Sequence, residues 1–224
     1  MLRLESSRPL ATAAEILEAE YGWTINYEDP QDYCPQETTG ATGAAVTKVV
    51  NQPRPLIPKP VRLEVRFPLA PHPPTNMEKR AILSRVVEAA RREAGRNFTL
   101  MEADGSVDLI PSGYLDANCR FIARRSLMDT RVALEPGPRS FARILQEFVA
   151  ALSKATGRPI GLGAGPTNFL NQTQLPMASL GGPARSVLRR LIDASKRKLA
   201  WQLLVDPGTG MAMLNLHFVE TAQK

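Results

Sequence analysis

The sequence predicts an α+β protein in which small strand–helix–strand(–strand) modules repeat and form two halves with largely antiparallel sheets. Segments with apolar residues at helical spacing alternate with short segments in which every second residue is apolar. The order strand, helix, strand recurs along the chain, and proline and glycine separate many of these segments. We therefore expect a first half over 1–113, whose two modules are joined by a proline-rich connection over 31–60, and a second half over 114–224 with two further modules.

The module at the C-terminal end shows the pattern most clearly. An amphipathic helix over Pro183–Lys198 is followed by two alternating strands, Leu199–Asp206 and Met211–Phe218, with a Pro-Gly-Thr-Gly turn between them. If Asp206 faces Met211, the cross-strand register is fixed and one face of the hairpin is entirely apolar. This register predicts a core made of Val187, Leu188, Leu191, Ile192, Trp201, Leu203, Leu214, Leu216 and Phe218.

The same patterns place the other elements. Helices are expected over Pro9–Tyr21 and Asn76–Ala94, and between Ser140, a natural N-cap, and Gly157, a natural terminator. An Asp-Gly pair at 104–105 between two alternating runs predicts a tight hairpin. Strands are expected at Leu2–Leu4, Trp23–Tyr27, Val46–Val50, Val61–Phe67, Thr130–Leu134 and Arg158–Leu162, and a loop is expected at Gly163–Asn171.

Composition and charge set broad limits. A chain of 224 residues can bury a substantial core, and a net charge of +6 permits an anionic partner without requiring one. No run of about 18 apolar residues is present, so we expect no membrane span. Because Met1 leads directly into a strand-like stretch, we also expect no signal peptide within this chain.

The two ends of the chain share an order of elements: a helix, a strand that begins with tryptophan, and then Asp-Pro. The stretches that carry it are Pro9–Leu17, Gly22, Trp23–Tyr27, Pro183–Leu191 and Trp201–Val205. In this order the chain resembles the secretin and TonB short N-terminal module of bacterial envelope proteins. With the strings Tyr27–Pro30 and Leu214–His217 it also resembles uncharacterised bacterial secreted proteins. The resemblance implies a periplasmic or secreted setting and non-catalytic contact with another envelope protein, and it transfers no catalytic residue.

The two cysteines, Cys34 and Cys119, leave two alternatives open. Their even number and the resemblance to envelope proteins allow a disulfide, which would close a long loop. Two separate thiols are the other alternative.

The outer face of the final hairpin is the candidate binding surface. It carries the apolar residues Leu204, Met211 and Met213 beside the polar residues Asn215 and His217. Methionine adapts its shape to a partner, and polar groups supply direction, so this mixture suits an interface. The alternative is that the face packs against the first half of the protein itself, because Leu204 and Met213 are apolar enough to be interior.

Candidate catalytic and metal sites are few. The histidines His72 and His217 have no neighbouring residues at metal-ligand spacing, so we expect no metal site and no cofactor. A hydrolase that uses His217 at a site between the halves is the alternative, because catalytic triads need no proximity in sequence. Asp29 and Asp206 each precede a proline and are interpreted as turn residues.

Two further motifs have ordinary structural interpretations. The glycine-rich run 161–165 lacks an expected helix directly behind it, so it is interpreted as a loop rather than as a dinucleotide-binding motif. The basic helix 184–198 could bind phosphates weakly, but no aromatic residues for base stacking lie among its charges, so nucleic-acid binding is not expected. Its basic residues, expected to face solvent, are Arg185, Arg189, Arg190, Lys196 and Arg197.

Overall fold

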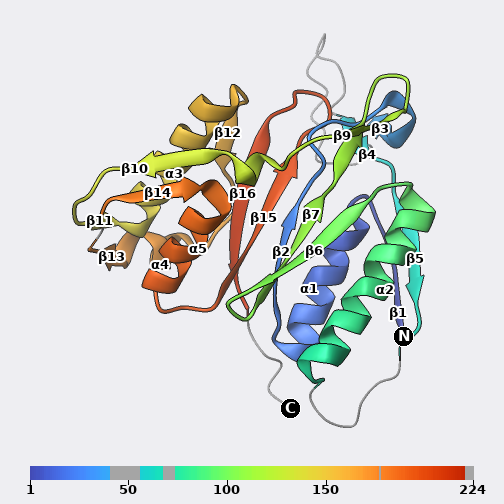
Figure 1. Ribbon diagram of the computed structural model, residues 1–224, viewed down its shortest axis with the longest axis horizontal. Helices are drawn as coiled ribbons and strands as arrows, with labels where there is room; N and C mark the ends of the chain where they lie inside the picture. The colour runs from blue at the N-terminus through green and yellow to red at the C-terminus, as the bar shows by residue number, and fades with distance from the viewer. Residues whose placement is uncertain (41–55, 68–73, 177, 220–224) are drawn as a thin grey trace.

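The computed structural model describes residues 1–40, 56–67, 74–176 and 178–219. It shows an α+β fold with one central sheet, helices on both sides of it and small two-stranded sheets farther out (Figure 1). The α+β class is therefore confirmed. The six strands of the central sheet lie in the order β12 (Ile160–Leu162), β16 (Ala212–Phe218), β15 (Leu199–Val205), β2 (Thr24–Glu28), β7 (Ser106–Pro111) and β6 (Phe98–Ala103).

Antiparallel pairing predominates, as the sequence predicts. Among the described residues seven strand pairs are antiparallel, and three are parallel: β12 with β16, β15 with β2, and β2 with β7. The small sheets pair β1 (Leu2–Ser6) with β5 (Val61–Val65), β3 (Thr38–Gly40) with β4 (Leu56–Pro58), β8 (Gly113–Leu115) with β9 (Phe121–Ala123), β10 (Arg131–Leu134) with β14 (Leu180–Pro183), and β11 (Arg139–Ser140) with β13 (Gln174–Leu175).

The helices end where local chemistry predicts. They are α1 (Pro9–Tyr21), α2 (Asn76–Ala94), α3 (Phe141–Thr156), α4 (Thr167–Gln172) and α5 (Ala184–Ala194). Gly22, Gly95 and Gly157 follow α1, α2 and α3 in the left-handed conformation, with φ of 65°, 66° and 69°, which glycine adopts without steric cost. The hydroxyl of Ser140 accepts a hydrogen bond from the Arg143 N–H, as expected of an N-cap.

Each half has the same layered arrangement. In the first half α1 and α2 lie between the β1–β5 pair and strands β2, β7 and β6; in the second half α3 and α5 lie between the β10–β14 pair and strands β12, β16 and β15. The two helices of each half share one apolar core. The repetition of four small modules is therefore not confirmed, and the boundary between residues 113 and 114 stays a prediction.

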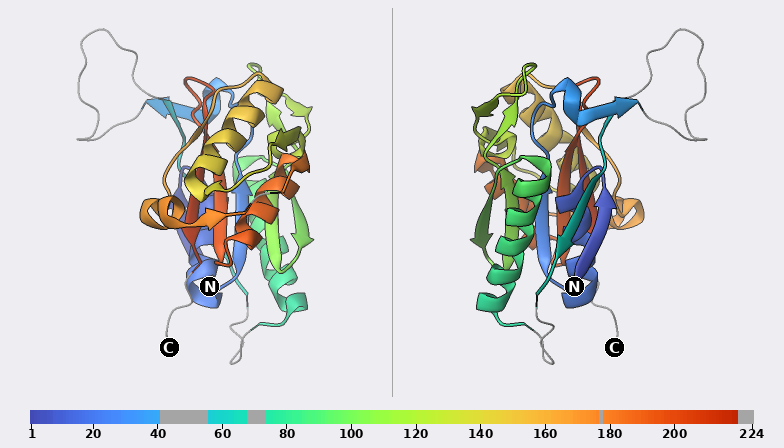
Figure 2. Two further views of the ribbon diagram at one scale, coloured as in Figure 1. Left: turned by 90° about the vertical axis from the view of Figure 1, so that its left-hand side faces the viewer. Right: turned by 90° about the vertical axis from the view of Figure 1, so that its right-hand side faces the viewer.

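The two helix pairs cover opposite faces of the central sheet (Figure 2). Where β15 pairs with β2, Gln202 lies opposite Tyr27, and Leu203 lies opposite Glu28. Residues opposite each other in a sheet point to the same face. Leu203 therefore points to the same face as Glu28, and Tyr27, the residue before Glu28 in the strand, points to the other face. Because Tyr27 belongs to the core of the first half and Leu203 to the core of the second, the two cores lie on opposite faces.

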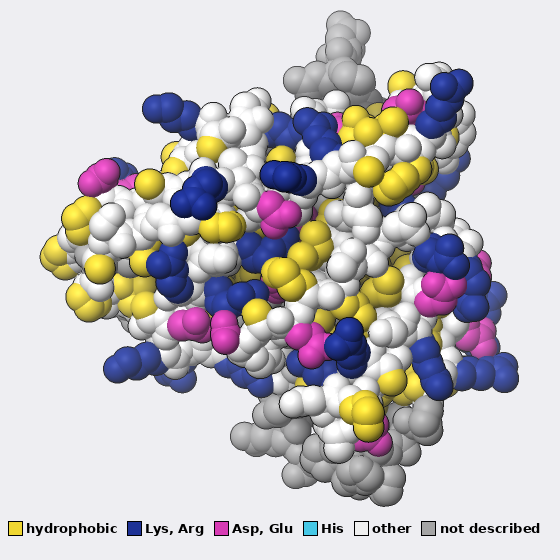
Figure 3. All heavy atoms as spheres, in the orientation of Figure 1, with side chains coloured by type: hydrophobic (Ala, Val, Ile, Leu, Met, Phe, Trp, Pro, Cys, Tyr) yellow, Lys and Arg dark blue, Asp and Glu magenta, His cyan; other side chains and the backbone are white. Residues whose placement is uncertain are grey.

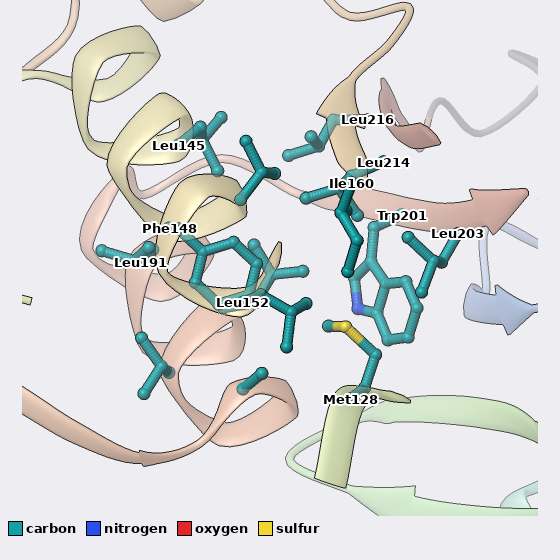
Figure 4. Close-up of a cluster of buried hydrophobic side chains, with 14 of the residues drawn as sticks. Met128, Leu145, Phe148, Leu152, Ile160, Leu191, Trp201, Leu203, Leu214 and Leu216 are labelled. Atoms are coloured by element: carbon teal, nitrogen blue, oxygen red, sulfur yellow. The ribbon is translucent and has the colours of Figure 1, made fainter. Parts of the chain in front are cut away.

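The register of the final hairpin is confirmed. Asp206 faces Met211, with its N–H donating to the Met211 carbonyl at 2.8 Å, and the pairs continue to Leu199 opposite Phe218. The expected core residues line one cluster in which Trp201 lies among aliphatic side chains of α3 and of the neighbouring strands (Figure 4). Phe218 is the exception, because it is 38% exposed and contacts Phe169 of α4 at its edge.

Other expectations differ from the structure. α5 ends at Ala194 rather than Lys198, because the chain turns at Lys196, whose φ is 56°. The segment 163–171 is not all loop, since the short helix α4 begins at Thr167. The expected strand Val46–Val50 lies outside the described residues.

Cys34 and Cys119 form a disulfide, with their Cα atoms 5.3 Å apart. The bridge joins the segment that follows β2 to the turn between β8 and β9. Of the two alternatives that the sequence leaves open, the structure has the bridge.

We predict that Trp201→Ala lowers the free energy of unfolding by about 3–5 kcal/mol, because it leaves a cavity in the core of the second half. Urea unfolding followed by circular dichroism measures this. Met77→Ala is the control, since Met77 is 81% exposed and its truncation should change stability by less than about 0.5 kcal/mol. Equal, small losses for both variants would show that the hairpin register is wrong.

Candidate functional site

The candidate binding surface, here called the hairpin face, consists of Leu204, Met211, Met213, Asn215 and His217. The structure brings these residues to the face of the central sheet that α1 partly covers. Leu204 is half-buried and packs against the core of the first half. Met211 is 38% exposed, and Met213, Asn215 and His217 are partly exposed. The Leu204 end of the hairpin face therefore lies against the first half, as the second alternative expects, and the Met211 end is at the surface; binding of a partner there stays a prediction.

His217 is held by a residue of α1. Its Nε2 lies 2.7 Å from Glu18 Oε2, while Glu18 Oε1 accepts the Ile25 N–H at 2.8 Å. The hydrogen bond to Glu18 raises the pKa of His217, desolvation opposes that shift, and the charges of Glu18 and Glu15 add to the rise. Glu18 thereby links α1, β2 and β16.

Gly161 in β12 and Gly163 directly after it make room for the side chains of the hairpin face. A Cβ atom on Gly161 would lie 3.1 Å from side-chain atoms of both Met211 and Met213, and one on Gly163 would lie 2.1 Å from Asn215 Oδ1. The methionine and asparagine side chains therefore lie across β12 rather than pointing away from it. These contacts give Gly161 and Gly163 a structural role in the run 161–165. Asn215 Oδ1 also accepts the Ala164 N–H at 2.7 Å, which fixes its orientation.

A second polar site, here called the junction cluster, is buried between the halves and was not predicted. It consists of Glu28, Asp108, Ser126, Arg185 and Arg189. Arg185 lies 2.9 Å from a carboxylate oxygen of Glu28 and 3.4 Å from one of Asp108, and its side chain is only 3% exposed. Burial raises the pKa of Glu28, and the opposing effects of Arg185 and of the Ser126 and Leu127 hydrogen bonds moderate the shift.

The junction cluster corrects two expectations about the basic helix. Arg185 does not face solvent but is buried, with its guanidinium 5.5 Å from the centre of the Trp201 ring. Arg189 is held at 3.0 Å by Asp108. Arg190 donates to the Gly181 carbonyl at 2.8 Å. With Arg185 and Arg189 neutralised internally, this helix offers less positive charge to a phosphate backbone than its sequence indicates. On the face seen in Figure 3, Lys and Arg are scattered among acidic and apolar side chains rather than gathered in one patch.

The prediction that Asp29 is a turn residue is wrong. Asp29 is a buried residue that links the two halves. Its carboxylate accepts hydrogen bonds from Arg8 Nε at 2.7 Å, from the Tyr27 hydroxyl at 2.7 Å and from the Val205 N–H at 2.9 Å. Arg8 also donates to the Val205 carbonyl at 2.8 Å. Asp206, by contrast, is a turn residue, because its side chain accepts the N–H groups of residues 208 and 209.

A cavity of about 320 Å³ in the first half adjoins Asp29 and is lined in part by Arg8, Tyr33 and Arg96. Both guanidinium groups are already paired, Arg8 with Asp29 and Arg96 with Glu37 at 2.7 Å. Arg96 also lies over the Tyr33 ring, 4.1 Å from its centre. These internal pairs leave the cavity with little net charge to attract an ionic ligand.

A hydrolase site at His217 would need a nucleophile or a metal ion beside the histidine. Among the described residues no Ser, Thr or Cys hydrogen bonds to His217, and both cysteines are in the disulfide. In the same part of the chain no group of three or more His, Cys, Asp and Glu side chains could hold a metal ion. His72 lies outside the described residues. Within the described residues, the hydrolase alternative thus has a histidine–carboxylate pair but no hydroxyl or thiol hydrogen-bonded to that histidine.

We predict that Arg185→Met lowers the free energy of unfolding by about 3–5 kcal/mol, because it leaves the buried carboxylate of Glu28 without its counter-charge, whereas Asp108 keeps Arg189. Chemical unfolding in urea measures the loss. Arg190→Met, on the exposed side of the same helix, is the matched control and should cost less than about 0.5 kcal/mol. A similar small loss for both would mean that the junction cluster is solvated.

We predict that the pair of His217 and Glu18 stabilises the fold at low pH only. A histidine whose pKa is raised in the folded state contributes stability below its ordinary value of 6.5, and this contribution disappears as the pH rises through the raised pKa. The difference in unfolding free energy between wild type and His217→Asn should therefore shrink above pH 6.5. Titration of His217 by NMR, with Glu18→Gln as the control, checks the cause; a pKa at or below 6.5 in the wild type would contradict it.

No helix in the described parts of the chain combines the length and the apolar character that a membrane span requires. Comparison of the sequence with protein-family models and with curated proteins, and comparison of the fold with solved structures, finds no match. The function is therefore argued from the geometry of this molecule.

Proposed function

We propose that this chain is a non-catalytic binding or scaffold protein of the bacterial cell envelope, and that it contacts another envelope protein through the exposed end of the hairpin face. The observation that carries the proposal is the position of Met211 and Met213. Met211 is exposed and Met213 is half-buried, and both side chains lie against Gly161 of β12, where a partner can cover them.

Several properties of this surface support the proposal. Methionine side chains adapt to the shape of a partner at little cost, and Asn215 beside them supplies a polar group held in a fixed orientation. Such a mixture of adaptable apolar and oriented polar groups is common in protein interfaces. The residues of the hairpin face belong to the hairpin of β15 and β16, which is part of the central sheet and holds them rigidly.

The envelope setting rests on two supports. One is the resemblance to the secretin and TonB short N-terminal module at both ends of the chain. The other is the disulfide between Cys34 and Cys119, which is compatible with an oxidising compartment.

We predict that a photo-crosslinking amino acid at position 211, expressed in a bacterial host, forms an adduct with one envelope protein. The same group at position 77, which is 81% exposed but far from the hairpin face in sequence, is the control for unspecific capture. The protein identified in this way is then purified and its binding measured directly.

The double variant Met211→Ser, Met213→Ser should lose binding to the purified partner by tenfold or more while its unfolding free energy changes little. Unchanged affinity in this variant would contradict the proposal. A large loss of stability would show that the methionines are part of the protein's own core.

A further inference from the structure

The central sheet has two outer edges, and the internal symmetry of the fold shows how one of them can be used. In both halves a parallel pair is followed by an antiparallel pair: β2, β7 and β6 in the first, β12, β16 and β15 in the second. Residues that lie opposite one another across these strands are Ile25, Val107 and Glu102 in the first half, and Ile160, Ala212 and Val205 in the second. β6 therefore corresponds to β15, residue by residue.

The outer edge of β15 is occupied, because β2 pairs with it in parallel. The Asp29 N–H donates to the Leu203 carbonyl at 2.8 Å. Two outward N–H groups of β15 are bound by side chains of β2: that of Trp201 by Asn26 Oδ1 at 3.1 Å, and that of Val205 by Asp29 Oδ2 at 2.9 Å. A single strand with an asparagine and an aspartate three residues apart thus provides hydrogen-bond partners for the outward backbone groups of β15.

Among the described residues, the corresponding edge of β6 has no such partner. The Ser112 N–H donates to the Asn97 carbonyl at 2.9 Å, and antiparallel pairing alternates, so the N–H groups of Phe98, Leu100 and Glu102 point away from β7. In the part of the chain that the structure describes, no residue hydrogen bonds to these three N–H groups. They correspond to Trp201, Leu203 and Val205, the groups that β2 engages on β15.

The opposite edge, at β12, is short, and the N–H groups of Ile160 and Ala164 are already bound there. β12 is only 3 residues long. Ser153 Oγ accepts the Ile160 N–H at 3.3 Å. Asn215 Oδ1 accepts the N–H of Ala164, the residue that corresponds to Asp29 of β2. Short strands with occupied backbone groups are a common protection against edge-to-edge association. A second copy of this chain therefore cannot pair its β12 with β6 in the way that β2 pairs with β15.

We propose that the outer edge of β6 binds an extended segment of a different protein as an added parallel strand, and that this segment carries an Asn or Asp and, three residues later, an Asp. These side chains would bind the N–H groups of Phe98 and Glu102, while backbone groups pair with Leu100. Arg80 of α2, whose side chain is 72% exposed, lies 3.7 Å from Glu102 and offsets part of the negative charge of that carboxylate at this edge. The site lies at the other end of the sheet from the hairpin face and does not depend on it.

The molecule itself supplies the probe. A synthetic peptide spanning Trp23–Pro30 with blocked ends has the sequence that occupies the equivalent edge of β15. We expect this peptide at millimolar concentration to slow hydrogen exchange of the Phe98, Leu100 and Glu102 amides by about tenfold, as about nine-tenths occupancy gives. The full chain is used, and exchange is followed by NMR. Unchanged exchange at all three amides overturns the proposal.

Two controls test the chemistry of the edge. The peptide with Asn26→Ala and Asp29→Ala should bind about four- to hundredfold more weakly, because each lost hydrogen bond weakens binding by about two- to tenfold. In the protein, Glu102→Pro removes an outward N–H, whereas Glu102→Gln removes only the charge, so binding should fall in the first variant and persist in the second. Equal binding of both peptides overturns the proposed segment chemistry, and the peptide pair decides alone if the proline variant does not fold.

Discussion

The parallel pairing of β2 with β15 is the contact on which the rest of this structure depends. Its register comprises only two residue pairs, Gln202 with Tyr27 and Leu203 with Glu28. So few backbone contacts would leave two half-sheets free to separate. The side chains of Asn26 and Asp29 extend the pairing at both ends. The buried ion pair between Glu28 and Arg185 also holds the two halves together. The consequence is one continuous sheet with a separate apolar core on each face.

Buried charges at this junction fix orientation more than they add stability. Taking ions out of water costs free energy that their mutual attraction only partly returns. What Arg185 does contribute is discrimination: a rotated or shifted second half would leave Glu28 and Asp108 buried without a cation. The same logic applies to Asp29, which is inaccessible to water and must meet both Arg8 and the Val205 N–H.

The sequence predicts the parts of this fold that local chemistry determines. The bounds of α1 and α2 follow from apolar periodicity and from the glycines behind them, and the register of the final hairpin follows from its turn. The hairpin face is likewise visible in the alternation of β15 and β16. What could not be predicted is contact between distant residues: Arg185 and Glu28 are 157 positions apart, so the arginine looks like any basic residue on an amphipathic helix.

One signal for the junction is present in the sequence. Thr24, Asn26 and Glu28 place polar groups on one side of β2. In a strand at the centre of a sheet both sides are covered, so polar residues there indicate partners rather than water. The same reasoning would have separated Asp29 from Asp206, although both precede proline.

The disulfide has a consequence for the integrity of the chain. Cys34 and Cys119 are 85 positions apart, and the loop that they close contains α2 and strands β5, β6 and β7. A protease that cuts once anywhere within this loop leaves both fragments covalently attached. The nicked molecule would keep its mass on a non-reducing gel and separate only after reduction. In an environment rich in proteases, the bridge thus converts a cut that would detach part of the central sheet into one that the folded protein survives.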